Sequence, residues 1–153
     1  NTPMVKHHNE KYNGHYPVWV AVELFSFGNL ASLYDIMIPE DRQAIADLYN
    51  TQANHLSSWI LSLIEVRNIC AHYSRLYNMP LKQTPFLYSE HRKYRTPMNK
   101  VFPIMLVIKR MTNGNKLWNE FFLKIQNPFH DYSTVINLSF IGFPKEWIAI
   151  LST

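Results

Sequence analysis

The stretch HLSSWILSLIEVRNICAHYSRLYN, residues 55–78, decides the fold of this chain. Apolar and small residues recur along it at spacings of three and four, which is typical of a helix that buries one stripe. These residues are Leu56, Trp59, Ile60, Leu63, Val66, Cys70 and Ser74. At about 100° per residue, the opposite side carries Leu61, Glu65, Asn68, His72 and Arg75. The pattern predicts one long helix with a polar face towards its C-terminal end.

Two residues of this helix have side chains suited to phosphate chemistry, Arg67 and His72. They lie about 140° apart around an ideal helix. One site can use both only if the guanidinium of Arg67 curls around the helix or the helix end deforms. The other possibility is that a second copy of the helix supplies the missing partner.

The order of residues here resembles a known motif. Arg67, the polar Asn68, three further residues and then His72 resemble the motif of HEPN ribonucleases. The wider string RNICAHYSRLYN, residues 67–78, resembles the abortive-infection (Abi) family of bacterial phage-defence proteins, a HEPN branch. Residues 17–37, PVWVAVELFSFGNLASLYDIM, and residues 141–147, IGFPKEW, resemble the same family. The resemblance implies a HEPN-like helical bundle that corresponds to the C-terminal part of a longer family member.

The resemblance also implies a chemistry. It implies a homodimeric, metal-independent and cofactor-free endoribonuclease in which the RNA's own 2′-OH attacks and a 2′,3′-cyclic phosphate is left. Arg67, Asn68 and His72 would be catalytic, and Tyr73 and Arg75 would be secondary substrate contacts. These residue types suit the roles, because histidine moves protons near neutral pH and arginine binds phosphate in a bidentate manner. Asn68 can orient a phosphate oxygen or the imidazole.

Two other interpretations stay open for these residues. Arg67, Asn68 and His72 can form a structural polar cluster, since histidine is favoured near a helix C-terminus by the helix dipole. The chain can also be a non-catalytic RNA-binding or protein-regulating helical module of a defence or toxin–antitoxin system. A trigger, either phage-derived or a guide RNA, is a further partner that the sequence leaves open.

Length and composition agree with one folded domain. The chain has 153 residues, of which 47% are hydrophobic and 17% charged, and its formal net charge is +4. The small positive excess is compatible with RNA as a partner without indicating it. The single Cys70 excludes an internal disulfide and indicates a reducing cytosol, with the thiol expected to be a small buried hydrophobe. No carboxylate or thiolate cluster accompanies His7, His8 and His15, so no metal site is predicted.

Residues 17–37 are the most apolar stretch, and one continuous helix is expected there. Glu23, Asn29 and Asp35 interrupt it at depths that a bilayer disfavours, so it is expected to be a core helix and not a membrane span. Glu23 either points to solvent or pairs with Arg67 or His72, in which case it would orient the site. Residues 1–16 are expected to be a flexible leader, and residues 17–153 a single cytoplasmic domain.

The remaining chain predicts further helices and one long connection. Helices are expected over residues 39–49, 101–112 and 116–126, with Pro128 ending the last, and a helical turn over residues 144–147. Residues 113–115, Asn-Gly-Asn, are expected to form a turn. No stretch alternates cleanly enough for a strand, so the fold class expected is an all-α bundle of about five or six helices.

Residues 81–100 are expected to be a long irregular loop that carries the run HRKYR, residues 91–95. Together with Tyr88 and Tyr94, the basic residues Arg92, Lys93 and Arg95 offer phosphate charge beside stacking surfaces for single-stranded RNA. A solvated basic loop is the other interpretation. We expect the loop to lie near the helix end that carries His72, because it follows that end in the chain.

Overall fold

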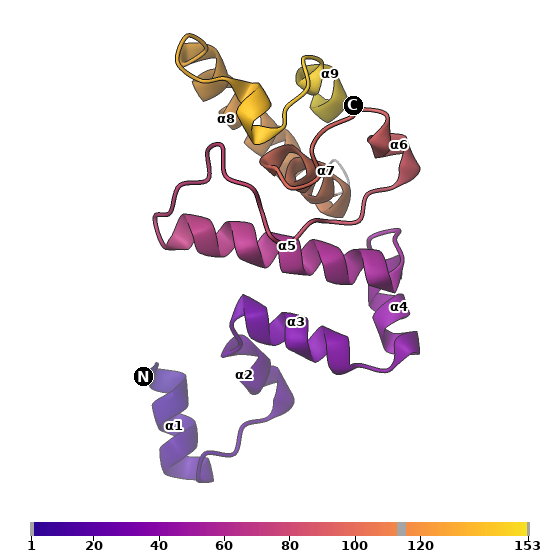
Figure 1. Cartoon of the computed structure of the whole chain (residues 1–153). Helices are drawn as coiled ribbons and strands as arrows, with labels where there is room; N and C mark the ends of the chain where they lie inside the picture. Colours follow the sequence, from indigo (N-terminus) through magenta and orange to yellow (C-terminus); the bar gives the residue numbers. More distant parts are fainter. Residues whose placement is uncertain (1, 113–115, 153) are drawn as a thin grey trace. The chain divides into compact units, whose positions relative to one another are not determined.

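The computed structural model describes residues 2–112 and 116–152, and these residues contain nine α-helices, one short 3-10 helix and no strand (Figure 1). The expected all-α fold class is confirmed, and the described residues hold nine α-helices where about five or six were expected. The turn expected at residues 113–115 lies outside the described residues. The chain divides into two compact units, an N-terminal unit, Asn1–Ile36, and a C-terminal unit, Met37–Thr153. The single domain expected from residue 17 onwards stays a prediction, but the division between the units falls at residue 36.

The N-terminal unit contains α1 (Pro3–Tyr12), α2 (Val18–Glu23) and α3 (Phe27–Ile36). The sequence pattern indicates no regular element in residues 1–16, whereas the structure has α1 there. Thr2 caps this helix, because its hydroxyl accepts the Val5 N–H at 3.4 Å. Pro3 occupies the first turn, where its missing N–H leaves no hydrogen bond unmade. The flexibility expected of the leader stays a prediction.

The single helix expected over residues 17–37 is wrong, because α2 ends at Glu23 and α3 begins at Phe27. Ser26 and Asn29 cause the break. The Asn29 N–H donates to the Ser26 hydroxyl at 3.1 Å, and the Ser26 N–H donates to Asn29 Oδ1 at 3.0 Å. This reciprocal pairing is that of a capping box, with asparagine in the place of the usual glutamate, so Ser26 starts a new helix.

The C-terminal unit is built around α7 (Val101–Thr112), whose bounds match the expected helix. Six consecutive residues of α7, from Phe102 to Val107, are buried. The helix packs against α5 (Ala53–Ala71), α8 (Lys116–Asp131) and α9 (Trp147–Ser152), while α4 (Pro39–Asp47) packs against α5. The other elements are the short α6 (Ser89–Arg92) and η1 (Leu138–Ile141).

Two helix ends differ from the expected ones. α8 continues past Pro128 to Asp131, so the expectation that Pro128 ends this helix is wrong. α5 ends at Ala71, seven residues before the predicted end. There the Tyr73 N–H donates to the Cys70 carbonyl at 3.2 Å and the Ser74 N–H to the Ile69 carbonyl at 3.0 Å. These two bonds form a Schellman motif, with His72 as the C-cap residue and Tyr73 in the left-handed conformation at φ 51°.

The buried stripe of α5 is partly as predicted. Leu56 and Trp59 are buried, as expected. Cys70 is exposed, and the expectation of a buried thiol is wrong because the helix ends one residue later and leaves its last turn uncovered. Ser62 is buried instead, and its hydroxyl is satisfied by the Trp59 carbonyl at 2.9 Å.

The connection after α5 runs back along this helix towards its N-terminal end (Figure 1). The carboxylate of Glu65 accepts the N–H groups of Lys82 and Gln83, at 2.9 and 2.6 Å. Further along, the Trp59 indole N–H donates to the Phe86 carbonyl at 2.7 Å. The hydroxyls of Thr51 and Tyr88 then lie 2.8 Å apart. The basic run therefore lies at the N-terminal end of α5, and the expectation that it lies near His72 is wrong.

No helix in the described part of the chain has both the length and the apolar character needed to cross a membrane.

Candidate functional site

The C-terminal end of α5 borders an open hollow of about 440 Å³. Glu65, Asn68 and His72 line it, as the polar face of the predicted helix requires. Ile69, Ser74, Met79, Lys82 and Gln83 complete the lining. The structure thus brings Asn68 and His72 together on one surface, and the exposed His72 imidazole is open to a ligand.

Arg67 lies outside this lining but is connected to it. Its side chain is exposed, and its guanidinium donates to Asn68 Oδ1 at 3.1 Å. Asn68 therefore links Arg67 to the hollow that holds His72. The helix end also departs from ideal geometry at His72, at φ −94° and ψ 16°, which is one of the ways in which both residues can address one site.

Glu23 belongs to the N-terminal unit, whereas Arg67 and His72 belong to the C-terminal unit. Within its own unit the Glu23 side chain is exposed, which agrees with the solvent-facing interpretation. The pairing of Glu23 with Arg67 or His72 stays a prediction.

The two expected substrate contacts beyond His72 are both exposed. Tyr73 has 99% of its surface accessible and a positive φ, which is uncommon for a bulky residue. An exposed aromatic ring beside His72 can stack on an RNA base. Arg75 lies two residues further on and is exposed as well, so a phosphate can reach it without displacing protein.

Glu65 shares the hollow with His72 but has a structural task, because its carboxylate fixes the N–H groups of Lys82 and Gln83. We expect Glu65→Ala to lower the free energy of unfolding by about 1 kcal/mol, since both hydrogen bonds are partly replaced by water. Urea unfolding measures this loss. Glu65→Gln is the control, because its amide oxygen can still accept one of the two bonds, and it should lose less. Equal stability of wild type and Glu65→Ala would contradict this role.

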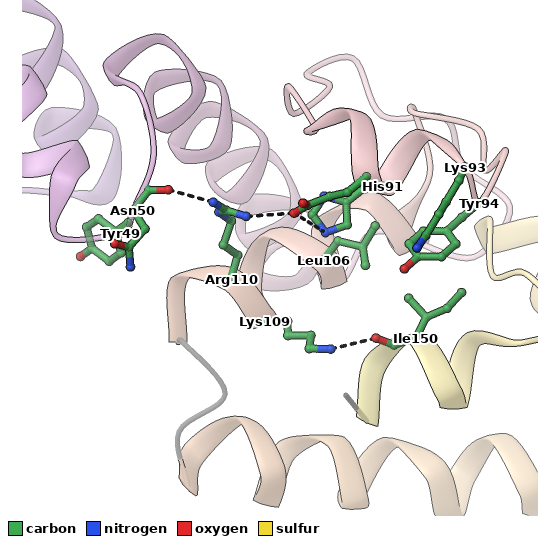
Figure 2. A pocket seen from close by; sticks show the side chains of 10 residues that line it. Tyr49, Asn50, His91, Lys93, Tyr94, Leu106, Lys109, Arg110 and Ile150 are labelled. Carbon is green, nitrogen blue, oxygen red and sulfur yellow. Dashed lines mark hydrogen bonds and ion pairs between the residues drawn. The ribbon is translucent and has the colours of Figure 1, made fainter.

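The predicted basic run is divided between two hollows at the other end of α5. Arg92, the last residue of α6, lines a hollow of about 410 Å³ together with Phe86 and His91. Lys93 and Tyr94 line a cleft of about 580 Å³ (Figure 2). There Lys93 Nζ lies over the Tyr94 ring, 5.2 Å from its centre. Arg95 is exposed and has a φ of 50°.

The two groups of expected RNA contacts are well separated. α5 has 19 residues, which at 1.5 Å each span about 28 Å. His72 follows its last residue, whereas the basic run lies near Thr51 at its start. The residues predicted to contact RNA therefore lie on two separate surfaces of one protomer, one at each end of α5.

The prediction from sequence missed three residues of the larger cleft: His91, Lys109 and Arg110. Arg110 donates to the Asn50 carbonyl at 2.8 Å and to Glu90 Oε1 at 3.2 Å, and its guanidinium lies 4.2 Å from the centre of the Tyr88 ring. The sequence signal that could have indicated Lys109 and Arg110 is their position together in the last turn of the apolar helix α7. Such a pair is usual at a helix C-terminus, so it did not stand out.

Within residues 2–112 and 116–152, no three histidine, cysteine, aspartate or glutamate side chains gather in a way that could hold a metal ion.

The family described as Abi-like protein matches residues 1–78 of this chain. The match covers more than half of the sequence, so the chain belongs to the Abi-like protein family. The matched range takes in the N-terminal unit, α4, α5 and the turn that carries His72. Membership of this family supports a role in abortive infection. No curated protein and no solved structure matches the chain.

Proposed function

We propose that this chain acts in abortive infection as a metal-independent endoribonuclease of the HEPN type. The observation that carries the proposal is the end of α5, where His72 and Asn68 line one hollow and Arg67 is hydrogen-bonded to Asn68. This family member therefore holds a proton carrier, an amide and a guanidinium on one accessible surface. Phosphodiester cleavage by a neighbouring 2′-OH needs these kinds of group.

Each residue has a distinct task in this proposal. His72 takes the proton from the 2′-OH or gives one to the leaving 5′-oxygen. The Arg67 guanidinium stabilises the charge that develops on the phosphorane oxygens. Asn68 orients this guanidinium through their hydrogen bond. Tyr73 stacks on a base next to the scissile phosphate, and Arg75 binds a neighbouring phosphate.

One protomer supplies one histidine at this surface, whereas the reaction needs both a base and an acid. A second copy related by a two-fold axis supplies the other, and two-fold dimers are the commonest oligomers. The N-terminal unit has apolar side chains suited to such an interface, since Val18, Trp19 and Ile36 are each at least 75% exposed. The homodimer is therefore part of the proposal.

We expect a dimer at tens of micromolar protein, on the order of the concentrations at which weak interfaces assemble. Sedimentation velocity measures this, and Trp19→Ser is expected to shift the distribution towards monomer. Leu123→Ser, on the exposed face of α8, is the matched control and should leave the distribution unchanged. A wild-type protein that stays monomeric would contradict the composite site.

The proposal is tested by incubating the purified protein with structured RNA in EDTA. Cleavage that persists in EDTA and is lost in His72→Ala supports the enzyme. Binding without cleavage would instead favour the non-catalytic RNA-binding module, for which the basic cleft at the other end of α5 is the specific observation. Neither binding nor cleavage would leave the Arg67–His72 group as a structural cluster.

The basic run is expected to extend the RNA contact. Neutralising Arg92, Lys93 and Arg95 together should weaken RNA binding and reduce the dependence of affinity on salt, because each phosphate contact releases counterions. The measurement is binding of a labelled single strand at several salt concentrations. A salt dependence equal to that of wild type would assign the run to solvated surface.

A further inference from the structure

The cleft of about 580 Å³ in the C-terminal unit is lined by both cationic and apolar side chains (Figure 2). Its volume lies in the range of sites that hold small organic ligands. The lining includes the cations Lys93, Lys109 and Arg110 and also the aromatic and apolar side chains of Tyr94, Leu106 and Ile150. A ligand that matches both kinds of side chain has an anionic group and a flat apolar part.

The positive charge of the cleft is not balanced by the protein. Glu90 is the one carboxylate that lines it, and its Oε1 already lies 3.2 Å from the Arg110 guanidinium. Among the described residues, Lys93 and Lys109 have no carboxylate partner. Lys109 is half-buried, and its Nζ donates to the Ile150 carbonyl at 2.8 Å. An ammonium has three N–H donors, so two donors of a partly desolvated cation are left for an anion.

His91 adds a further polar group to the lining of the cleft. Its side chain is 18% exposed, and its Nδ1 is buried without a hydrogen-bond partner. Burial lowers the pKa of His91, Glu90 opposes this, and Arg110, Lys109 and Lys93 lower it further. Nδ1 is therefore a polar atom that the protein itself does not satisfy.

We propose that this cleft binds a nucleotide, with its phosphate held by Lys93 and Lys109 and its base against Tyr94. Lysine binds phosphate as a point charge, and tyrosine stacks on any base. The nucleotide is either a free mononucleotide or the 5′-phosphorylated end of an RNA strand. The site lies at the opposite end of α5 from His72, so it goes beyond the proposed nuclease and does not depend on it.

Titration calorimetry of the full chain with adenosine 5′-monophosphate, adenosine and inorganic phosphate tests the site. The monophosphate is expected to bind roughly tenfold more tightly than adenosine, because charge-assisted hydrogen bonds to the phosphate are lost in the nucleoside. Lys109→Met should weaken binding by a similar factor. Lys116→Met, at an exposed position at the start of α8, is the matched control and should bind as wild type does.

Lys109 also bonds to the Ile150 carbonyl, so a second variant separates binding from folding. Lys93→Met alters an exposed side chain and should weaken binding severalfold with an unchanged melting temperature. Tight binding of short RNA only when it carries a 5′-phosphate would identify the RNA end as the source. Tight binding of the monophosphate alone would identify the free nucleotide, and either result supports the site.

Three results would overturn the inference. The first is that the monophosphate binds wild type no better than adenosine does. The second is that Lys109→Met and Lys93→Met both bind it as wild type does. The third is that His72→Ala abolishes its binding, which would place the nucleotide at the other end of α5. Retained binding in a His72→Ala protein that cleaves no RNA is the expected result, and it distinguishes this site from the nuclease.

Discussion

RNA cleavage by His72→Ala is expected to fall about a hundredfold or more, the usual contribution of a general acid or base. The variant should unfold at nearly the wild-type denaturant concentration. The imidazole is exposed, so its removal should change the free energy of unfolding by less than about 0.5 kcal/mol. Cleavage rates and urea unfolding are measured on the same preparation.

His130→Ala is the matched control for this experiment. His130 is also an exposed histidine near a helix C-terminus, in α8, and its loss should leave cleavage unchanged. Equal activity of wild type and His72→Ala would remove His72 from the chemistry. A large loss of stability in His72→Ala would instead favour the structural polar cluster.

Arg67→Ala, measured in the same cleavage and unfolding experiments, tests the second residue of the proposed catalytic pair Arg67 and His72. It should lose cleavage to a similar extent, and Arg67→Lys should recover only part of it, because an ammonium cannot bind the phosphate in a bidentate manner. If Arg67 is instead a structural partner of Glu23, Arg67→Ala will lower stability and Glu23→Gln will partly restore it. That outcome would leave the proposed enzyme resting on His72 alone.

The largest effect on stability is expected at Trp59, in the middle of α5. Trp59 is 1% exposed, its indole N–H donates to the Phe86 carbonyl at 2.7 Å, and its ring lies edge-on to those of His55 and Tyr88. Trp59→Ala should lower the free energy of unfolding by about 3–5 kcal/mol, as deletion of a large core side chain does. Urea unfolding followed by far-UV circular dichroism measures this.

Two further variants separate packing from hydrogen bonding at this position. Trp59→Phe keeps a ring but leaves the Phe86 carbonyl without its donor, which should cost about 1–3 kcal/mol. Leu123→Ala removes an exposed apolar side chain of α8 and should change stability by less than about 0.5 kcal/mol. A loss for Trp59→Ala no larger than that for Leu123→Ala would contradict the assignment of Trp59 to the core.

Local patterns predicted much of the fold. The apolar run in α7 appears where residue spacing places it, and in α5 spacing correctly predicted that Leu56 and Trp59 are buried. The end of α5 was missed because Tyr73 occupies a left-handed position that is usually glycine. The break between α2 and α3 was missed because asparagine replaces the glutamate of the usual capping pattern at Asn29.

The candidate sites, like the fold, were predicted from the sequence only where local patterns determine them. Asn68 and His72 were predicted to share a face because they lie four residues apart on one helix, and they line one hollow. The position of the basic run depends on tertiary hydrogen bonds, from Glu65 to residues 82 and 83 and from Trp59 to Phe86, which carry the loop back along α5. No local sequence pattern encodes these bonds. No local pattern places Lys93 and Lys109 in the lining of one cleft either.

The chemical nature of the RNA ends tests the central proposal most directly. Wild-type protein is incubated with a defined RNA in EDTA, and the fragments are analysed by mass spectrometry. Attack by the RNA's own 2′-OH predicts a 2′,3′-cyclic phosphate on one fragment and a 5′-hydroxyl on the other, with neither formed by His72→Ala. Fragments that carry 5′-phosphates, or an RNA that stays intact, would contradict the account.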